Sequence, residues 1–275
     1  MPRLRALFLV PVGLALLAAA MDLTGPARAE TPRIRASYDV YFGGLHILAA
    51  EAEFEPGEAR YSATARSRTE GILAVFFDWR GQSRSEGRYV DHRAIPSRHR
   101  NTGLRGDETR DVEIAYDADG AVTRATVAPP PDPDEVTDLP ADAEVGTIDP
   151  LSVIAELMRA VTLGRECSGR YAVFDGRRRY DLIVTDQGAA TLPPTDYAIY
   201  SGPVMVCGVE YRLLGGERKE KSRYAKTARE RVVYVARPDA TLPAIPVGLK
   251  IETDFGTLMA HLTGIETLRR YADGR

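Results

Sequence analysis

The chain is poor in the residues and motifs on which most catalytic sites depend. Its 275 residues include only four histidines, two cysteines and one tryptophan. It contains no GxSxG, HExxH or CxxC motif, no Walker loop, and no GxGxxG segment after a predicted strand. We therefore expect no enzyme, and no catalytic residues, metal site or cofactor. The formal net charge of −3 argues against nucleic acid as a partner, because nucleic-acid-binding proteins usually carry excess positive charge.

The histidines do not suggest a metal site either. His92 and His99 lie seven residues apart, so on an extended chain their side chains point to opposite faces, about 23 Å apart. A turn at Pro96 would be needed to bring them together, and no third ligand is evident.

Long apolar runs are also missing after the first thirty residues. Arg3 and Arg5 precede an uncharged apolar run at residues 6–20, and Ala27–Ala29 has the small-x-small pattern of a signal-peptidase site. The alternative, a retained membrane anchor, is disfavoured because the run is short and contains proline and glycine. We predict that residues 1–29 are a cleaved signal peptide, which makes the protein periplasmic and leaves it without a transmembrane anchor.

The two cysteines, Cys167 and Cys207, both lie after the predicted cleavage site. In an oxidising compartment an even pair is most simply one disulfide. The alternative is a redox or metal-binding thiol pair. It is disfavoured because redox pairs usually have the CxxC spacing and no histidine accompanies these thiols.

Most of the remaining sequence alternates between apolar and polar residues, as strands with one buried face do. The pattern is clearest in residues 33–42, 45–54 and 60–66, with Gly43-Gly44 and Pro56-Gly57 as turns between them. We expect a single mainly β domain over residues 30–275. Its fold would be a large curved antiparallel sheet or open half-barrel.

One α-helix is strongly indicated, at about residues 150–162. Asp149 is a suitable N-cap, Pro150 suits the first helical position, and Gly164 suits the end. We interpret its apolar stripe as packing against the sheet, with a ligand-binding helix as the alternative. The stripe consists of Leu151, Ile154, Leu157, Met158 and Val161. The apolar segment Glu70–Trp79 fits either a short helix or a buried strand, because periodicity alone does not separate the two.

Two segments have unusual composition. Residues 128–149 are rich in proline and acidic residues, which predicts an extended linker or flap. Residues 215–231 are basic, and we interpret them as a solvated hairpin tip or as an edge that meets anionic lipid headgroups or an acidic protein. The basic candidates in that tip are Arg218, Lys219, Lys221 and Arg223.

Several stretches together resemble DUF3108, a family of exported bacterial proteins. They are Tyr38–Gly43 leading through Gly44 into an alanine-rich strand, Gly71–Gly87, the helix start Ile148–Ser152, the segment YAVFDGRRRY at Tyr171–Tyr180, and Leu242–Val247. The resemblance covers nearly all of the chain after the signal peptide. It implies a periplasmic half-barrel of the kind found in lipoprotein carriers such as LolA, without catalytic residues.

A curved sheet with one apolar face can bury that face in two ways. The helix can fill it, which favours a structural or interaction protein of the cell envelope, or a groove can remain that binds a lipid-like or amphiphilic molecule. Small inward residues (Ala50, Ala52, Ala63 and Ala65) leave room for a ligand, although they also suit close docking of the helix. We expect the lining of the groove to include Tyr38, Val40, Phe42, Phe54, Tyr61, Val112, Ile114, Leu182, Val184, Val247, Leu249 and Ile251.

Overall fold

The computed structural model describes residues 33–219 and 230–268. The predicted signal peptide and two of the basic-tip candidates, Lys221 and Arg223, lie outside these residues. The helices are α1 (Gly71–Phe76) and α2 (Pro150–Thr162). The strands are β1 (Arg33–Phe42), β2 (Leu45–Pro56), β3 (Arg60–Thr69), β4 (Trp79–Val90), β5 (Arg93–Arg105), β6 (Glu108–Tyr116), β7 (Val122–Ala128), β8 (Gly169–Phe174), β9 (Arg179–Leu192), β10 (Gly202–Gly215), β11 (Glu230–Ala236), β12 (Ile245–Thr253) and β13 (Gly256–Leu268).

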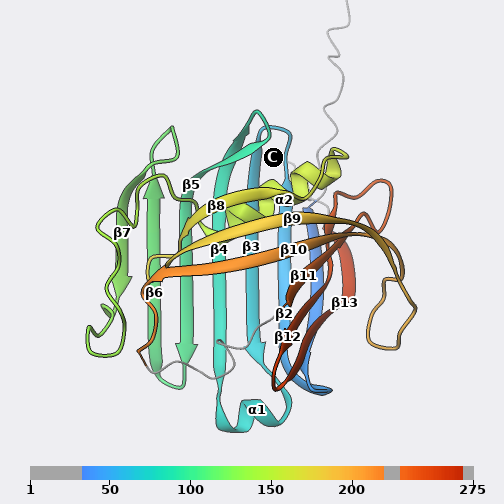
Figure 1. The fold of residues 1–275 in the computed structure, drawn as a ribbon, viewed down its shortest axis with the longest axis horizontal. Coiled ribbons are helices and arrows are strands. Elements are labelled where there is room, and N and C mark those ends of the chain that lie inside the picture. The colour runs from blue at the N-terminus through green and yellow to red at the C-terminus, as the bar shows by residue number, and fades with distance from the viewer. Residues whose placement is uncertain (1–32, 220–229, 269–275) are drawn as a thin grey trace, which may run out of the picture. The chain divides into compact units, whose positions relative to one another are not determined.

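All described strands belong to one 13-stranded sheet in the order β7-β6-β5-β4-β3-β2-β1-β13-β12-β11-β10-β9-β8. Every described neighbouring pair is antiparallel. The sheet curves so that β8, β9 and β10 cross in front of β3–β6 (Figure 1). The edge strands β7 and β8 do not pair, so the barrel stays open. This confirms the predicted mainly β half-barrel.

Side chains brought together by the strand register form rows across β1–β7, because directly paired residues of antiparallel strands share a face. On the outer face, Glu53 is buried beneath the guanidinium groups of Arg33, Arg35 and Arg66, with ion-pair distances of 3.0 Å to Arg35 and 3.2 Å to Arg66. The inner face is mostly apolar or small. Its first row, which passes under α2, is Ile34, Phe54, Ala63, Ser85, His99, Ile114 and Ala125.

Helix α2 lies between the two layers that the curved sheet forms. It contacts β3, β4 and β5 on one side and β8 and β11 on the other (Figure 1). Pro150 begins the helix and Asp149 caps it, accepting a hydrogen bond from the Ser152 amide at 3.0 Å. The predicted helix at 150–162 and its core-packing role are therefore confirmed.

The buried face of α2 is not quite the predicted stripe. Ile154 is exposed, whereas Ser152, Val153 and Ala155 are buried. Because sheet covers the helix on two sides, residues outside a single stripe become buried as well. The carboxylate of Glu156 also accepts a hydrogen bond from the Ala94 amide at 2.7 Å, which ties α2 to the start of β5.

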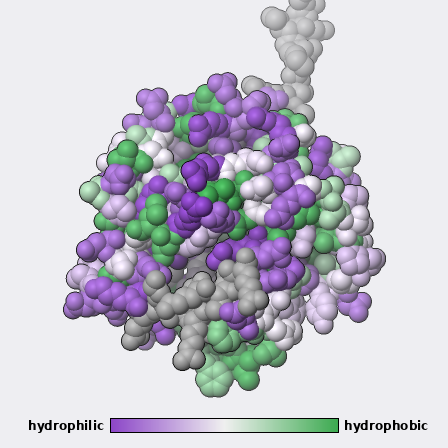
Figure 2. All heavy atoms as spheres, viewed as in Figure 1, coloured by the Kyte–Doolittle hydropathy of each residue, from purple (hydrophilic) through white to green (hydrophobic). Residues whose placement is uncertain are grey.

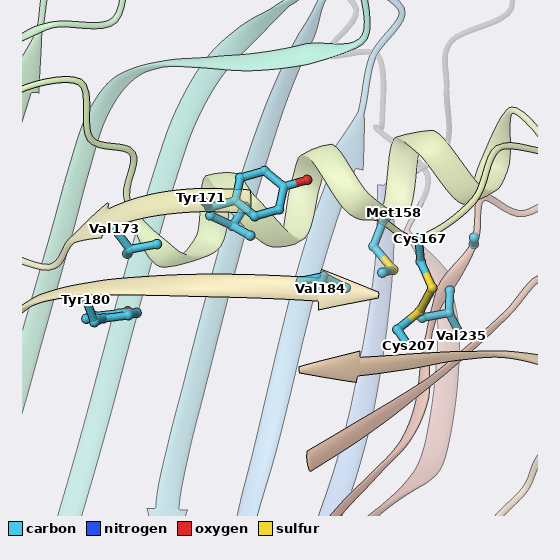
Figure 3. Packing of buried hydrophobic residues seen from close by; sticks show 10 residues of the cluster. Met158, Cys167, Tyr171, Val173, Tyr180, Val184, Cys207 and Val235 are labelled. Carbon is cyan, nitrogen blue, oxygen red and sulfur yellow. A yellow bond between two sulfur atoms is a disulfide. The ribbon is translucent and has the colours of Figure 1, made fainter. Parts of the chain in front are cut away.

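The disulfide between Cys167 and Cys207 forms as predicted. It joins the segment before β8 to the middle of β10, and both cysteines are buried. Met158 of α2 packs beside it (Figure 3). A crosslink across 40 residues contributes about 4 kcal/mol in the chain-entropy description.

The ambiguous segment Glu70–Trp79 contains the short helix α1 and is not a buried strand. None of the α1 side chains is buried, and Val75 and Phe76 are 78% and 82% exposed. They form the apolar patch at the lower end of the view in Figure 2, where Figure 1 places α1.

The proline-rich segment 128–149 is held against the chain that follows β10. The Thr137 amide donates to the Glu217 carbonyl at 2.8 Å, and the Lys219 amide donates to the Glu135 carbonyl at 2.8 Å. Of the predicted basic tip, Arg218 pairs with Glu135 at 3.4 Å and the Lys219 ammonium donates to the Pro133 carbonyl at 2.8 Å. Both cations therefore contact the 128–149 segment.

Candidate functional site: the interior of the sheet

The first inner row is closed to solvent around its two polar residues. Ser85 on β4 and His99 on β5 are directly paired and are 0% and 2% exposed. Asp149, at the start of α2, is 0% exposed and reaches both of them. Buried polar groups are costly unless their hydrogen bonds are satisfied, so the partners of these residues matter.

Two hydrogen-bond chains meet on the carboxylate of Asp149. In one, the Tyr61 hydroxyl donates to Ser152 Oγ at 2.6 Å, and Ser152 Oγ donates to Asp149 Oδ2 at 2.5 Å. In the other, His99 Nδ1 lies 2.8 Å from Ser85 Oγ, and Ser85 Oγ donates to Asp149 Oδ1 at 2.5 Å. Because the single hydroxyl proton of Ser85 goes to Asp149, Nδ1 of His99 is the donor in that chain.

These contacts set the ionisation of Asp149. Complete burial alone would raise the pKa of its carboxyl group. Hydrogen bonds from His99, Ser152 and Ser85, together with the attraction of His99, outweigh burial and hold the pKa below its ordinary value. Burial and the nearby Asp149 carboxylate raise the pKa of the Tyr61 hydroxyl, which stays protonated as a donor. We call these five residues (Tyr61, Ser85, His99, Asp149 and Ser152) the Asp149 network.

The Asp149 network contains a serine, a histidine and an aspartate, but not in the arrangement of a catalytic triad. In a triad the serine bonds one ring nitrogen of the histidine and the aspartate bonds the other. Here Ser85 and Asp149 both meet Nδ1 of His99, and Ser85 donates to the carboxylate. The network is also closed to any substrate. It instead fixes the N-terminus of α2 onto β3, β4 and β5.

Beyond the first row, the inner face is lined by small side chains that remain accessible to water. Ala52, Ala65, Ser83 and Asn101 are all half-buried, although the first-row residues next to them on β3–β5 are buried. The complete second row is Ala36, Ala52, Ala65, Ser83, Asn101, Val112 and Val127, and the third is Tyr38, Ala50, Ser67, Gly81, Gly103 and Arg110. At the centre of the third row the Trp79 ring lies over Gly81, where a Cβ atom would come within 2.6 Å of it.

The opposite wall of the interior comes from β9–β12. Its strand pairs place Leu182 beside Tyr211, Val184 beside Val209, and Val233 beside Leu249. All of these except Val184 are half-buried, and the rings of Tyr180 and Tyr211 lie 4.7 Å apart. The half-buried side chains of the two walls thus face each other across the inside of the curved sheet, and α2 packs between the walls at one end. We call the space between the second and third rows and this wall the open interior.

The predicted lining residues fall into two groups. Seven are half-buried on the inner face, namely Tyr38, Val40, Phe42, Phe54, Leu182, Leu249 and Ile251. Five lie in the packed core, namely Tyr61, Val112, Ile114, Val184 and Val247. Four of the second group are covered because α2 and the β8–β9 hairpin pack onto that end of the sheet. Val247 is buried in a separate cluster with Ile245 and Leu262.

The sequence analysis missed the polar residues of the inner face. Asp149 was predicted only as a helix cap, and His99 was considered only as a metal ligand. Ser83 and Ser85 alternate with Arg84 and Glu86, so the period of two could have placed both serines on the inner face. Within residues 33–219 and 230–268, no His, Cys, Asp and Glu group is arranged to hold a metal ion.

The fold and the interior define a class: a single-sheet, open antiparallel β protein whose helix closes one end of a partly apolar interior. The chain belongs to the DUF3108 family, described as "Protein of unknown function (DUF3108)", whose model matches residues 37–263. No curated protein matches it. None of the helices in the described ranges is long and apolar enough to cross a membrane.

Among solved structures, the chain is similar to a β-barrel-like protein of the DUF1849 family from Brucella abortus. The two share 12% sequence identity at a TM-score of 0.47, over 87% of this chain and 99% of that one. At this level the likeness carries no argument about function.

Proposed function

We propose that this protein is a non-catalytic binding protein that holds the apolar part of an amphiphilic or lipid-like molecule in the open interior. One observation carries the proposal. On β3–β5 the inward-facing residues of the second and third rows remain half-buried, although their first-row neighbours on the same strands are buried. An envelope scaffold with a filled core, the alternative, would cover all three rows alike.

The energy available in such an interior is sufficient for binding. Each CH2 group removed from water contributes about 0.8 kcal/mol, so a chain of about twelve carbons contributes about 10 kcal/mol before costs. The loss of translational and rotational freedom costs about 4 kcal/mol or more. Ser67, Ser83 and Asn101 offer hydrogen-bonding groups on the same face, which suits a ligand that is not wholly hydrocarbon.

The disulfide supports the predicted location. Structural disulfides persist in oxidising compartments, so the Cys167–Cys207 bond agrees with export to the periplasm through the signal peptide predicted at residues 1–29.

Binding of N-phenyl-1-naphthylamine, an uncharged probe that fluoresces in apolar surroundings, tests the proposal. Ala50 and Ala49 are neighbours on β2 that face opposite sides of the sheet, and both are half-buried. We expect Ala50→Phe to fill the open interior and weaken probe binding about tenfold or more, while Ala49→Phe leaves it unchanged. No probe binding by the wild type, or equal binding by both variants, would contradict the proposal.

A further inference from the structure

A pocket of about 450 Å³ is lined by four arginines together with the acidic residues Glu108, Asp132 and Glu135. It is bounded by the start of β6, by Pro129–Pro131, by the turn between β8 and β9, and by the chain after β10. The arginines that line it are Arg110, Arg177, Arg178 and Arg218. We call it the arginine pocket.

Three of these four arginines already have a carboxylate partner. Arg110 pairs with Glu108 at 2.8 Å, Arg178 with Asp175 at 2.9 Å, and Arg218 with Glu135 at 3.4 Å.

Arg177 is different. Its guanidinium donates to the carbonyls of Ala128 and Pro129 at 3.1 and 3.0 Å, and it forms no ion pair with a carboxylate of the described residues. Among the described residues, the pocket therefore holds one guanidinium that bonds backbone carbonyls and no carboxylate.

Arg177 is also crowded by like charge. Burial and the neighbouring Arg110 both lower the pKa of its guanidinium, and Arg178 adds to the effect. Asp175 and Glu108 raise the pKa of Arg177, but its net shift is still downward. A bound anion would offset this repulsion between the guanidinium groups.

The arginine pocket and the open interior share one residue, Arg110. Arg110 ends the third inner row, paired with Gly103. The charge of Arg178 also acts on Tyr211 of the opposite wall: burial raises the pKa of the Tyr211 hydroxyl, and Arg178 is the largest influence that lowers it. A molecule whose chain lies in the open interior can thus place one end among the arginines.

We propose that the arginine pocket binds the anionic head group, a phosphate or a carboxylate, of the amphiphile. This inference rests on the proposed function and narrows it to an anionic amphiphile. Guanidinium groups suit such a ligand because their planar fork can donate two parallel hydrogen bonds to the oxygens of one phosphate or carboxylate.

The test compares dodecyl phosphate with dodecanol, which has the same chain without the charge, as competitors of N-phenyl-1-naphthylamine on the full chain. Arg110→Gln is expected to raise the half-displacing concentration of dodecyl phosphate about tenfold and to leave that of dodecanol unchanged. Arg177→Lys, which keeps the charge but loses the fork, is expected to act in the same direction. Arg124→Gln, an exposed arginine near Glu113 of the outer face, is the control and should change neither value.

The outcomes separate this inference from the proposed function. Unchanged dodecyl phosphate competition in both pocket variants, or an equal loss for dodecanol, overturns the head-group assignment while probe binding still supports the open interior. If inorganic phosphate raises the melting temperature as far as dodecyl phosphate does, the pocket binds a free anion and the assignment is also overturned. If the wild type does not bind the probe or dodecanol, the proposed function fails and the inference falls with it.

Discussion

Ser85 and Asp149 are 64 residues apart in the chain, yet the Ser85 hydroxyl donates to the Asp149 carboxylate at 2.5 Å in a fully buried position. This bond joins the middle of β4 to the residue that caps α2. The helix that closes one end of the interior is thus held by a charged, hydrogen-bonded contact as well as by apolar packing.

Removal of the Asp149 charge should destabilise the fold. In Asp149→Asn, an amide with two donor hydrogens replaces a carboxylate that accepts four contacts, from Ser85, His99 and both the hydroxyl and the amide of Ser152. We expect a loss of about 3–5 kcal/mol in the free energy of unfolding, measured by urea denaturation. Asp142→Asn, an exposed residue of the preceding segment, should change it by less than about 0.5 kcal/mol. Similar values for both variants would show that the Asp149 network contributes little.

The contribution of Asp149 should disappear in acid. Its pKa is lower in the folded protein than in the unfolded chain, so its stabilisation is complete above the unfolded pKa of about 3.9 and is lost as the pH falls through the folded value. The difference in unfolding free energy between wild type and Asp149→Asn should therefore be fully present at about pH 5 and shrink below about pH 4. A difference that grew towards acid pH would contradict a lowered pKa.

The disulfide should be complete and should matter for stability. Thiol labelling under non-reducing, denaturing conditions should find no free cysteine. The Cys167→Ala/Cys207→Ala double variant should lose about 4 kcal/mol of unfolding free energy, because its unfolded chain is no longer constrained across 40 residues. Quantitative labelling of the native protein would disprove the pairing.

The β8–β9 turn should be sensitive to a single methyl group. Gly176 has φ +86° and a Cβ there would collide with Val112 of β6, whereas Gly188 has φ +89° with nothing within 4 Å. Alanine at either site should lower the free energy of unfolding by about 1–2 kcal/mol, because its Cβ atom disfavours the left-handed backbone conformation. Gly176→Ala should cost about 1–3 kcal/mol more, because it also disturbs the packing of the turn on β6. Equal losses by chemical denaturation would mean that the turn does not pack tightly on β6.

The features of the fold that the sequence predicts are those that depend on residues close together in the chain. Asp149 followed by Pro150 specifies the start of a helix by backbone chemistry alone. The alternation in residues 33–42 specifies a strand with one face towards solvent. The segment 70–79 stayed ambiguous because short apolar runs suit either structure, and its exposure depends on how far it lies from the rest of the sheet.

The candidate site was harder to predict because its residues meet only through tertiary contacts. Tyr61, Ser85, His99 and Asp149 come from three strands and a helix cap, and each alone looks like an ordinary strand or cap residue. Likewise, Val112 and Val184 share the apolar pattern of Leu182, but packing covers the first two and leaves the third half-buried.

By itself the sequence determined the period of its strands, the start of its helix and which two cysteines could pair, because each depends on neighbouring residues or on residue count. Only the tertiary structure decided where α2 lies between the layers of the sheet, which part of the inner face stays open, and that four arginines gather beside it. Those outcomes depend on how a curved sheet brings distant strands face to face, and no local pattern encodes that geometry.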